Sequence, residues 1–221
     1  WLELTQETRD VVAPLADRVG LAGRLAGLQD ESFRLLEPAT HAELSAKIGT
    51  TPASDAARLA ALLSSTEDLV RDLQLSTPSS QTLVNGRVKS RYSLHNKMQR
   101  KGLELGDILD RVALRVQVAD VDDCYVVLDA LHARYAEVPG STDDYVASPK
   151  ANGYQSLHTA VVLPDSAEPV EFQVRTFAMH ALAEHGDAAH WRYKLPSSGV
   201  SSGVSAGLGL VGGGLLSQPL V

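Results

Sequence analysis

The chain has 221 residues, of which 44% are hydrophobic and 21% charged, and this composition is typical of a folded globular protein. Its net charge of −7 at pH 7 argues against a protein that coats nucleic acid. No apolar run reaches the roughly 18 residues of a membrane-spanning helix, so none is expected. Cys124 is the only cysteine, which excludes an internal disulfide and fits a reducing compartment. Its sequence setting predicts a buried, inert thiol on a helix.

Residues 1–75 are expected to form a helical segment without a catalytic constellation. Apolar residues recur in it at helical spacing, as in Leu21, Leu25 and Leu28. Pro38 is expected to stop one helix or to start the next. The predicted helices span residues 6–18, 21–36, 39–48 and 53–74.

The pattern changes after residues 76–82, whose Ser, Thr and Pro content is typical of a linker. Alternating β-branched segments and amphipathic segments then follow one another along the chain. The predicted strands span residues 83–88, 112–118, 154–163 and 169–176, and the predicted helices span 90–100, 121–136 and 179–194. This alternation predicts an α/β domain over residues 76–194. Residues 195–221 are uncharged and low in complexity, so a disordered tail is expected.

A local positive patch lies within this acidic chain. There is no Asp or Glu between Ser76 and Gly102. The cationic side chains in that stretch are Arg87, Lys89, Arg91, Lys97, Arg100 and Lys101. One interpretation is a solvated helix face, and the other is a site for a small polyanion such as a nucleoside triphosphate. Ser93 and Lys97 are four residues apart and would share one helix face.

Two carboxylates are candidates for binding a divalent metal. Asp110 is expected to open the strand at 112–118. In the strand at 169–176, Glu171, Gln173 and Arg175 alternate with apolar residues, so one face is polar. Such a face is either an exposed edge or the wall of a site. On neighbouring strands, Asp110 and Glu171 could hold one Mg²⁺ through their oxygens.

The stretch SPKANGYQSLHT, residues 148–159, joins a glycine turn to a predicted strand. Strand alternation would place Tyr154, Ser156 and His158 on one face. No set of Cys or His residues has the spacing of a zinc site, and His185 and His190 are expected to be packing or surface residues. The chain contains neither a Walker loop nor a G-x-S-x-G motif.

In this order, the segments resemble the synthetase domain of the RelA/SpoT family, the (p)ppGpp synthetases. The matching stretches lie between about Leu83 and Lys194 and read GRVKSRYSLHNKM, DRVALRV, DDYVASPKANGYQSLHT, VEFQVRT and HALAEHGDAAHWRYK. The resemblance implies a nucleotidyltransferase-like mixed β-sheet flanked by helices, here preceded by the all-helical segment. It also implies transfer of the β,γ-pyrophosphate of ATP to the 3′-hydroxyl of GTP or GDP, with release of AMP and with Mg²⁺ as cofactor.

The resemblance implies roles for individual residues. Asp110 matches the Mg²⁺ ligand, and Glu171 matches the second acidic group, either a metal ligand or the base near the 3′-hydroxyl. The residues that match ATP contacts are Arg87 and Arg115, which would sandwich the adenine, and Lys89, Ser93 and Lys97, which would contact phosphates. Those that match contacts of the acceptor nucleotide are Lys150, Asn152, Tyr154, His158 and Gln173. Of these, Tyr154 would stack on the guanine, and Gln173 would be a polar partner of Glu171.

Two features depart from long members of the family. Residues 7–38 look like the helices that follow the family's hydrolase domain, but the His-Asp metal motif of that hydrolase is absent. Because the chain also begins with Trp1 rather than Met, we expect a truncated long-form member. The stretch 141–144 (STDD) has the acidic half of an E-x-D-D pattern without its Glu, which resembles the synthetase-only branch. The alternative is that Asp143 and Asp144 form a solvated turn.

Three hypotheses follow from the sequence. The first is an active pyrophosphokinase, the second a catalytically silent nucleotide-binding regulatory remnant, and the third a nucleotidyltransferase that acts on a polynucleotide. The acidic net charge disfavours the third. The expected partners are ATP and GTP or GDP, without membrane or direct nucleic-acid contacts. Contact with a regulatory domain or with the ribosome is expected only through parts absent from this chain. Cytoplasm is the default location, or the plastid stroma for a plant or algal source.

Overall fold

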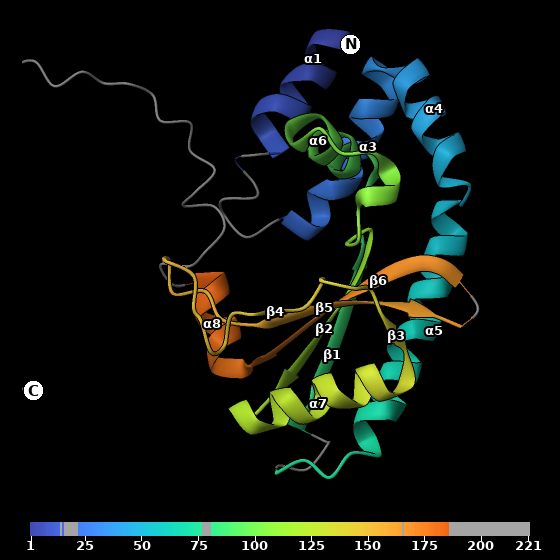
Figure 1. Cartoon of the computed structure of the whole chain (residues 1–221). Helices are drawn as coiled ribbons and strands as arrows, with labels where there is room; N and C mark the ends of the chain where they lie inside the picture. Colours follow the sequence, from blue (N-terminus) through green and yellow to red (C-terminus); the bar gives the residue numbers. More distant parts are fainter. Residues whose placement is uncertain (14, 16–21, 77–80, 165, 186–221) are drawn as a thin grey trace, which may run out of the picture.

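The computed structural model describes residues 1–13, 15, 22–76, 81–164 and 166–185. Helices come first along the chain, and a sheet with flanking helices follows (Figure 1). The sheet has six strands with both parallel and antiparallel neighbours, which confirms the expected mixed β-sheet flanked by helices. The predicted tail at 195–221 lies outside the described residues, as do residues 186–194 of the last predicted helix and His190 within it.

The N-terminal helices have boundaries that follow from backbone chemistry. They are α1 (Leu2–Glu7), the π-helical turn η1 (Thr8–Val12), α3 (Ala22–Leu36), α4 (Pro38–Ile48) and α5 (Pro52–Arg71). Pro38 and Pro52 each stand at the start of a helix, where an N–H would have no partner within that helix. Gly49 ends α4 with a φ of 72°. The helix predicted over 6–18 begins earlier, at Leu2, and its residues 14 and 16–18 lie outside the described part.

The sheet follows the helical segment. Its strands are β1 (Leu83–Val88), β2 (Val112–Val118), β3 (Ala136–Glu137), β4 (Asp143–Asp144), β5 (Leu157–Leu163) and β6 (Ser166–Thr176). Their order is β1-β2-β6-β5-β3, and β4 also pairs with β5. Strands β2 and β6 are parallel neighbours, and the other pairs are antiparallel. The accompanying helices are α6 (Arg91–Lys101), η3 (Leu105–Asp107), α7 (Val121–Arg134) and α8 (Phe177–His185).

Near the candidate site, one strand prediction was wrong at its start, and one residue was misplaced relative to its strand. The strand predicted over 154–163 begins only at Leu157. The N–H of Tyr154 donates to Asn152 Oδ1 at 3.1 Å, and its carbonyl accepts from the N–H of Lys150 at 3.1 Å. Both backbone groups of Tyr154 are therefore used inside the glycine turn and are not available to the sheet. Asp110 does not open β2 either, because it lies in a turn two residues before the strand begins.

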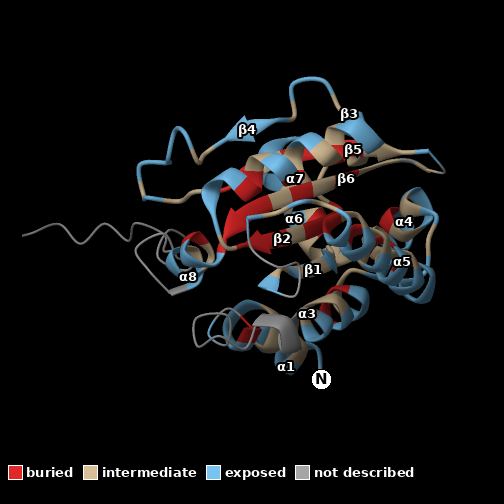
Figure 2. Cartoon of the chain, turned by 90° about the horizontal axis from the view of Figure 1, so that it is seen from below, coloured by how far each residue is buried: buried red, intermediate tan, exposed pale blue. Residues whose placement is uncertain are grey.

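The main core lies on one face of the sheet, under α5 and α7. Val112, Leu114, Val116 and Val118 of β2 alternate toward it, together with Phe172 and Val174 of β6. Figure 2 shows the buried residues concentrated in the central strands, with mostly exposed helices around them. The residues of β2 and β6 that lie between these apolar positions must face the other side of the sheet.

A second, smaller core joins the helical segment to α6. Phe33 of α3 and Leu44 of α4 form one buried cluster with Leu94 of α6 and Ile108. The ring of Phe33 also stacks on His95 of α6, with 4.9 Å between ring centroids. One side of helix α6 thus packs against α3 and α4. Lys97 of the same helix points instead to Asp110, beside the sheet.

Cys124 of α7 is fully buried in the main core, as expected from the sequence. Burial is also the main reason that the pKa of its thiol rises to about 12, which keeps it protonated near neutral pH. None of the helices that the structure describes combines the length and the apolar character needed to cross a bilayer.

Candidate active site

The sheet face opposite the main core carries a row of polar side chains. Strand pairing aligns one residue from each of five strands, in the order Asn85, Arg115, Gln173, His158 and Asp143. Glu171 and Arg175 lie on either side of Gln173 and face the same way. The sequence left open whether this polar face of β6 was an exposed edge or the wall of a site. Because β6 is an inner strand, between β2 and β5, it is a wall rather than an edge.

Asp110 is held by two lysines at one end of this face. Lys89, which directly follows β1, donates to Asp110 Oδ2 at 2.7 Å, and Lys97 of α6 donates to Oδ1 at 2.7 Å. Burial acts to raise the pKa of Asp110, but the hydrogen bonds and charges of the two lysines outweigh it and lower the pKa. The pKa of Lys89 is lowered, mainly by burial and further by its cationic neighbours Arg87 and Lys97.

Glu171 is the centre of a hydrogen-bonded chain on β5 and β6. Its Oε1 lies 3.3 Å from His158 Nδ1, and its Oε2 accepts from Gln173 Nε2 at 3.0 Å. Burial acts to raise the pKa of Glu171, but the contacts with His158 and Gln173 outweigh it, so that the pKa is lowered. The negative charge of Asp110 acts on Glu171 in the opposite direction, so the two carboxylates are close enough to interact.

The glycine turn brings an aromatic group to the far end of this chain. The hydroxyl of Tyr154 lies 2.8 Å from His158 Nε2, so Tyr154, His158 and Glu171 form one continuous series. Gly153 has a φ of 76°, which L side chains rarely adopt, and this conformation closes the turn. The ammonium of Lys150 lies 5.4 Å from the ring centroid of Tyr154. Burial raises the pKa of Tyr154, so its hydroxyl stays protonated at neutral pH.

Arg87 and Arg115 lie on adjacent strands and on the same face. In the antiparallel pairing Arg87 is opposite Ala113, so Arg115 is its diagonal neighbour. Such diagonal positions are about 7–8 Å apart. Arg115 Nη1 lies 3.7 Å from Glu184 of α8. Among the described residues, the buried Nε of Arg115 has no hydrogen-bond partner.

The sequence matches a known protein family and several curated relatives. Residues 86–198 match the family model described as a region found in RelA/SpoT proteins. The chain belongs to the RelA/SpoT family. It is 41% identical over 189 residues to a probable chloroplastic GTP diphosphokinase of Oryza sativa subsp. japonica, which covers 86% of this chain and 26% of that protein. A GTP pyrophosphokinase of Streptomyces coelicolor is 41% identical over 189 residues, 86% of this chain and 22% of its own length.

A solved structure supports the same assignment of fold. A GTP pyrophosphokinase family protein from Streptococcus pneumoniae is 29% identical, with a TM-score of 0.53 over 63% of this chain and 75% of that chain. The present RelA/SpoT chain spans about a quarter of the length of the curated relatives it matches.

Most of the residues that the resemblance assigns to nucleotides lie together in this member of the family. Asp110, Lys89 and Lys97 form one group, and Glu171, Gln173, His158 and Tyr154 form a second group, whose carboxylate is within range of the charge of Asp110. Ser93 lies at the start of α6, next to its capping residue Ser90, whose Oγ accepts from the N–H of Ser93 at 3.2 Å. Asn152 acts within the glycine turn, where it accepts from the N–H of Tyr154.

Several side chains at this site were not assigned from the sequence. Tyr145 carries the ammonium of Lys150 over its ring, 4.0 Å from the centroid, and its ring packs edge-on against His158. Glu184 of α8 contacts both Arg115 and the fully buried Arg175, which lies 3.5 Å away. The position of Tyr145 directly after an acidic pair was visible in the sequence, but its contacts depend on how the loop returns to β5.

Asp143 and Asp144 are not a freely solvated turn. They form β4 at the edge of β5. Asp144 also accepts from the hydroxyl of Tyr125 at 3.0 Å and from the N–H groups of Val146 and Ala147 at 2.9 and 2.8 Å. The acidic pair therefore shapes the approach to the glycine turn.

The donor set fits Mg²⁺ that arrives with a nucleotide. Mg²⁺ is usually held by one or two carboxylates together with substrate phosphates and water. Asp110 and Glu171 supply two carboxylates that interact with each other and whose pKa values are both lowered, so both are ionised at neutral pH. Within the described residues, no group of three or more His, Cys, Asp or Glu side chains gathers into a complete metal site. The remaining ligands would therefore come from phosphate and water.

Proposed function

We propose that this chain is a (p)ppGpp synthetase that transfers the pyrophosphate of ATP to the 3′-hydroxyl of GTP or GDP and releases AMP. One observation carries this proposal. A carboxylate held by two lysines, Asp110, interacts with a second carboxylate, Glu171, that is linked through a histidine to an aromatic ring on the same sheet face. The relatives in rice and Streptomyces coelicolor are named for the same reaction.

The ATP side of the proposal rests on the cations around Asp110. Lys89 and Lys97 present two ammonium groups to a common point, and Ser93 lies at the N-terminal end of α6, where the helix dipole favours an anion. Arg87 and Arg115 are diagonal neighbours on one sheet face, so that both guanidinium groups can reach a common planar ring. An adenine would be held between them.

The acceptor side rests on the glycine turn. Tyr154 offers a ring face for guanine, and stacking on such a face contributes about 1–3 kcal/mol. Lys150 lies over Tyr145 and beside Tyr154, so its ammonium is near the phosphates of a nucleotide stacked there. The 3′-hydroxyl of a guanine nucleotide stacked on Tyr154 would then have to reach Glu171.

The chemistry follows from these positions. The 3′-oxygen of GTP forms a bond to the β-phosphorus of ATP, the bond from that phosphorus to the α-phosphate oxygen breaks, and AMP leaves. Glu171 accepts the proton of the 3′-hydroxyl, and its lowered pKa means that it is ready as a carboxylate. Lys89 and Lys97 neutralise charge on the transferred group. Mg²⁺ held by Asp110 and Glu171 would supply further charge neutralisation and orient the phosphates.

The test is nucleotide chromatography after incubation with ATP, GTP and Mg²⁺. Asp110→Asn and Glu171→Gln remove the two carboxylate charges, and Asp129→Asn and Glu67→Gln are matched controls at exposed positions on α7 and α5. We expect equal amounts of AMP and pppGpp from the wild-type chain and from the controls. We expect neither product from the two site variants.

Other outcomes would distinguish the competing hypotheses. A wild-type chain that binds GTP without releasing AMP would be the nucleotide-binding remnant. Binding to RNA that weakens steeply with salt would favour a polynucleotide substrate. Replacing GTP by GDP in the same assay determines the preferred acceptor.

The location and wider partners are also part of the proposal. The rice relative is named chloroplastic, and the single buried Cys124 suits a reducing compartment such as the cytoplasm or the plastid stroma. The curated relatives are about four times longer than the part this chain matches, and contacts with regulatory domains or with the ribosome are proposed for such additional parts.

A further inference from the structure

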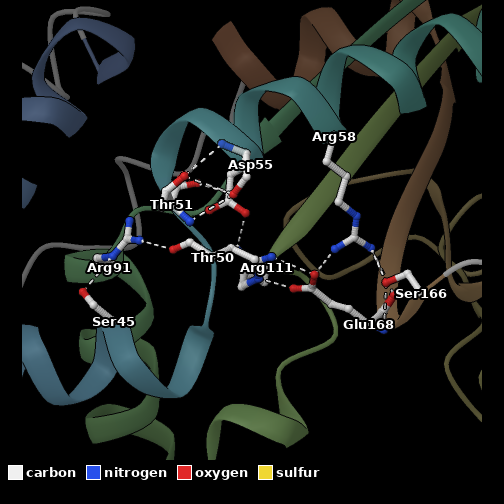
Figure 3. A network of polar contacts seen from close by, with 10 residues as sticks. Ser45, Thr50, Thr51, Asp55, Arg58, Arg91, Arg111, Ser166 and Glu168 are labelled. Atoms are coloured by element: carbon white, nitrogen blue, oxygen red, sulfur yellow. Dashed lines mark hydrogen bonds and ion pairs between the residues drawn. The ribbon is translucent and has the colours of Figure 1, made fainter.

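A largely buried ion network surrounds Arg111, the residue that follows Asp110 in sequence (Figure 3). Arg111 is its centre and donates to Asp55 of α5 at 3.0 Å and, through Nη2, to Glu168 of β6 at 2.7 Å. Arg58, one helical turn after Asp55, hydrogen-bonds to the same Glu168 and donates to Ser166 Oγ at 2.9 Å. The network thus joins one helix of the N-terminal segment to β6 and to the residue that precedes β2.

The network consists of charged side chains whose burial would be unfavourable in free energy if they were not paired. The side chains of Arg111 and Asp55 are only 6% and 7% exposed, and those of Arg58 and Glu168 are 24% and 26% exposed. Burial acts to raise the pKa of Glu168, but Arg111 and Arg58 outweigh it and lower the pKa. A buried charge that loses its partner is strongly unfavourable, so each member constrains the position of the others.

The main chain of Arg111 connects this network to the candidate site. Arg111 follows Asp110 directly, and its carbonyl accepts from the N–H of Lys89 at 2.7 Å. Lys89 in turn donates from its side chain to Asp110. A shift of Arg111 would therefore move Asp110, its neighbour in sequence, and Lys89, which is hydrogen-bonded to its carbonyl.

The N-terminal helices also fix the helix that carries Lys97, the second lysine at Asp110. Helix α6, which carries Lys97, contacts α4 and the loop after it, because Arg91 donates to Ser45 Oγ of α4 at 3.0 Å and to the carbonyl of Thr50 at 2.9 Å. The N–H of Tyr92 donates to Asp30 Oδ1 of α3 at 2.7 Å. Figure 3 shows the contacts of Arg91 with Ser45 and Thr50 close to the one that Asp55 makes with Arg111. Both lysines that hold Asp110 are thus on backbone fixed by the helical segment.

We propose that Arg111 is a positioning residue for the pyrophosphoryl-transfer site, and that Asp55 and Arg58 of α5 act through it to fix Asp110 and Lys89. The helical segment is then the rear wall of the catalytic unit, not only a connection that precedes it. This inference rests on the proposed synthetase function for its kinetic test, and its metal-binding test is independent of turnover.

The experiment uses the full 221-residue chain and the variant Asp55→Ala. The control is Asp68→Ala, which removes an acid from the same helix whose partner Arg71 is exposed. Asp55→Asn is the conservative variant, because its amide oxygen can still accept from Arg111. Turnover is measured per folded molecule, and Mn²⁺ affinity is measured by electron paramagnetic resonance with a non-hydrolysable ATP analogue.

We expect Asp55→Ala to lower kcat and weaken Mn²⁺ binding by about 10- to 100-fold, the usual effect of losing an outer partner of a metal ligand. The KM for GTP should be unchanged, because the Tyr154 turn lies at the other end of the site. Asp55→Asn should recover most of both losses, and Asp68→Ala should behave as the wild-type chain.

A variant that melts at a lower temperature but keeps its kcat and Mn²⁺ affinity would overturn the inference, since the network would then be structural only. If Asp55→Ala does not fold, Arg58→Met is the second variant and is judged by the same two measurements. A wild-type chain that makes no product would refute the proposed function, while the Mn²⁺ titration would still decide the role of Arg111.

Discussion

The contact of Asp110 with two lysines predicts that free metal binds poorly until a nucleotide is present. Both carboxylate oxygens of Asp110 already accept a hydrogen bond from an ammonium group, each at 2.7 Å. A divalent cation must compete with these ammonium groups, by charge and by space, for the same carboxylate. Triphosphate would attract the lysines away from Asp110 and so free its oxygens. We therefore predict that Lys97→Met tightens Mn²⁺ binding to the nucleotide-free chain, although it lowers turnover with ATP.

The size of the effect follows from the geometry. The side chains of Lys97 and Asp110 are 21% and 20% exposed, so their contact is partly shielded from water. A hydrogen bond to a charged group contributes about 1.5–3 kcal/mol. Because about 1.4 kcal/mol corresponds to a factor of ten, removing this competitor should tighten Mn²⁺ binding by roughly 10- to 100-fold.

The assay is a Mn²⁺ titration followed by electron paramagnetic resonance, with and without a non-hydrolysable ATP analogue. Lys101→Met is the matched control, since Lys101 ends the same helix and is exposed. Equal Mn²⁺ affinities of the wild-type chain and of Lys97→Met without nucleotide would refute the reasoning. So would a gain that persists when Asp110→Asn is added, because the metal would then be bound elsewhere.

Three further predictions concern the same site. Tyr154→Leu should raise the KM for GTP by about 5- to 150-fold, the equivalent of 1–3 kcal/mol of stacking, and steady-state kinetics should show little change in the KM for ATP. Gly153→Ala should cost about 1–2 kcal/mol in urea unfolding, because φ is 76° at this position, and should weaken GTP binding more than ATP binding. The lowered pKa of Asp110 contributes stability that is present above its unfolded pKa of about 3.9 and is lost as the pH falls toward the folded value. The melting temperature should therefore fall below about pH 4, and less so in Asp110→Asn; an identical fall in both would contradict this.

Periodicity predicted an α/β domain because the strands and helices of this part differ clearly in it, whereas the mixed sheet was implied by the family resemblance. Residues 112–118 and 121–136 matched β2 and α7 closely, since β-branched alternation and an acidic helix start are local signals. The start of β5 was wrong because a turn that satisfies the backbone of Tyr154 through Asn152 has no periodic signature.

The parts of the site that the sequence did not predict are those made by long-range contacts. The prediction that Asp110 and Glu171 lie on neighbouring strands was wrong for Asp110, which lies in the turn before β2, and nothing local indicated that Lys89 and Lys97 would both contact Asp110. The network around Arg111 was missed for the same reason, because Asp55 is 56 residues away in sequence. A single charged residue in a predicted helix usually faces solvent, so nothing in the local sequence indicated that Asp55 would be buried against Arg111.

The place of β6 has a consequence for how the protein is made. Among the strands of the described residues it is the last in sequence, yet it lies between β2 and β5. During synthesis, β2 and β5 each have an open edge until residues 166–176 have left the ribosome. Glu171 is on β6. A nascent chain that lacks β6 therefore has neither a complete sheet nor the second carboxylate of the candidate site. An unfinished chain should therefore be both inactive and prone to strand pairing with other chains.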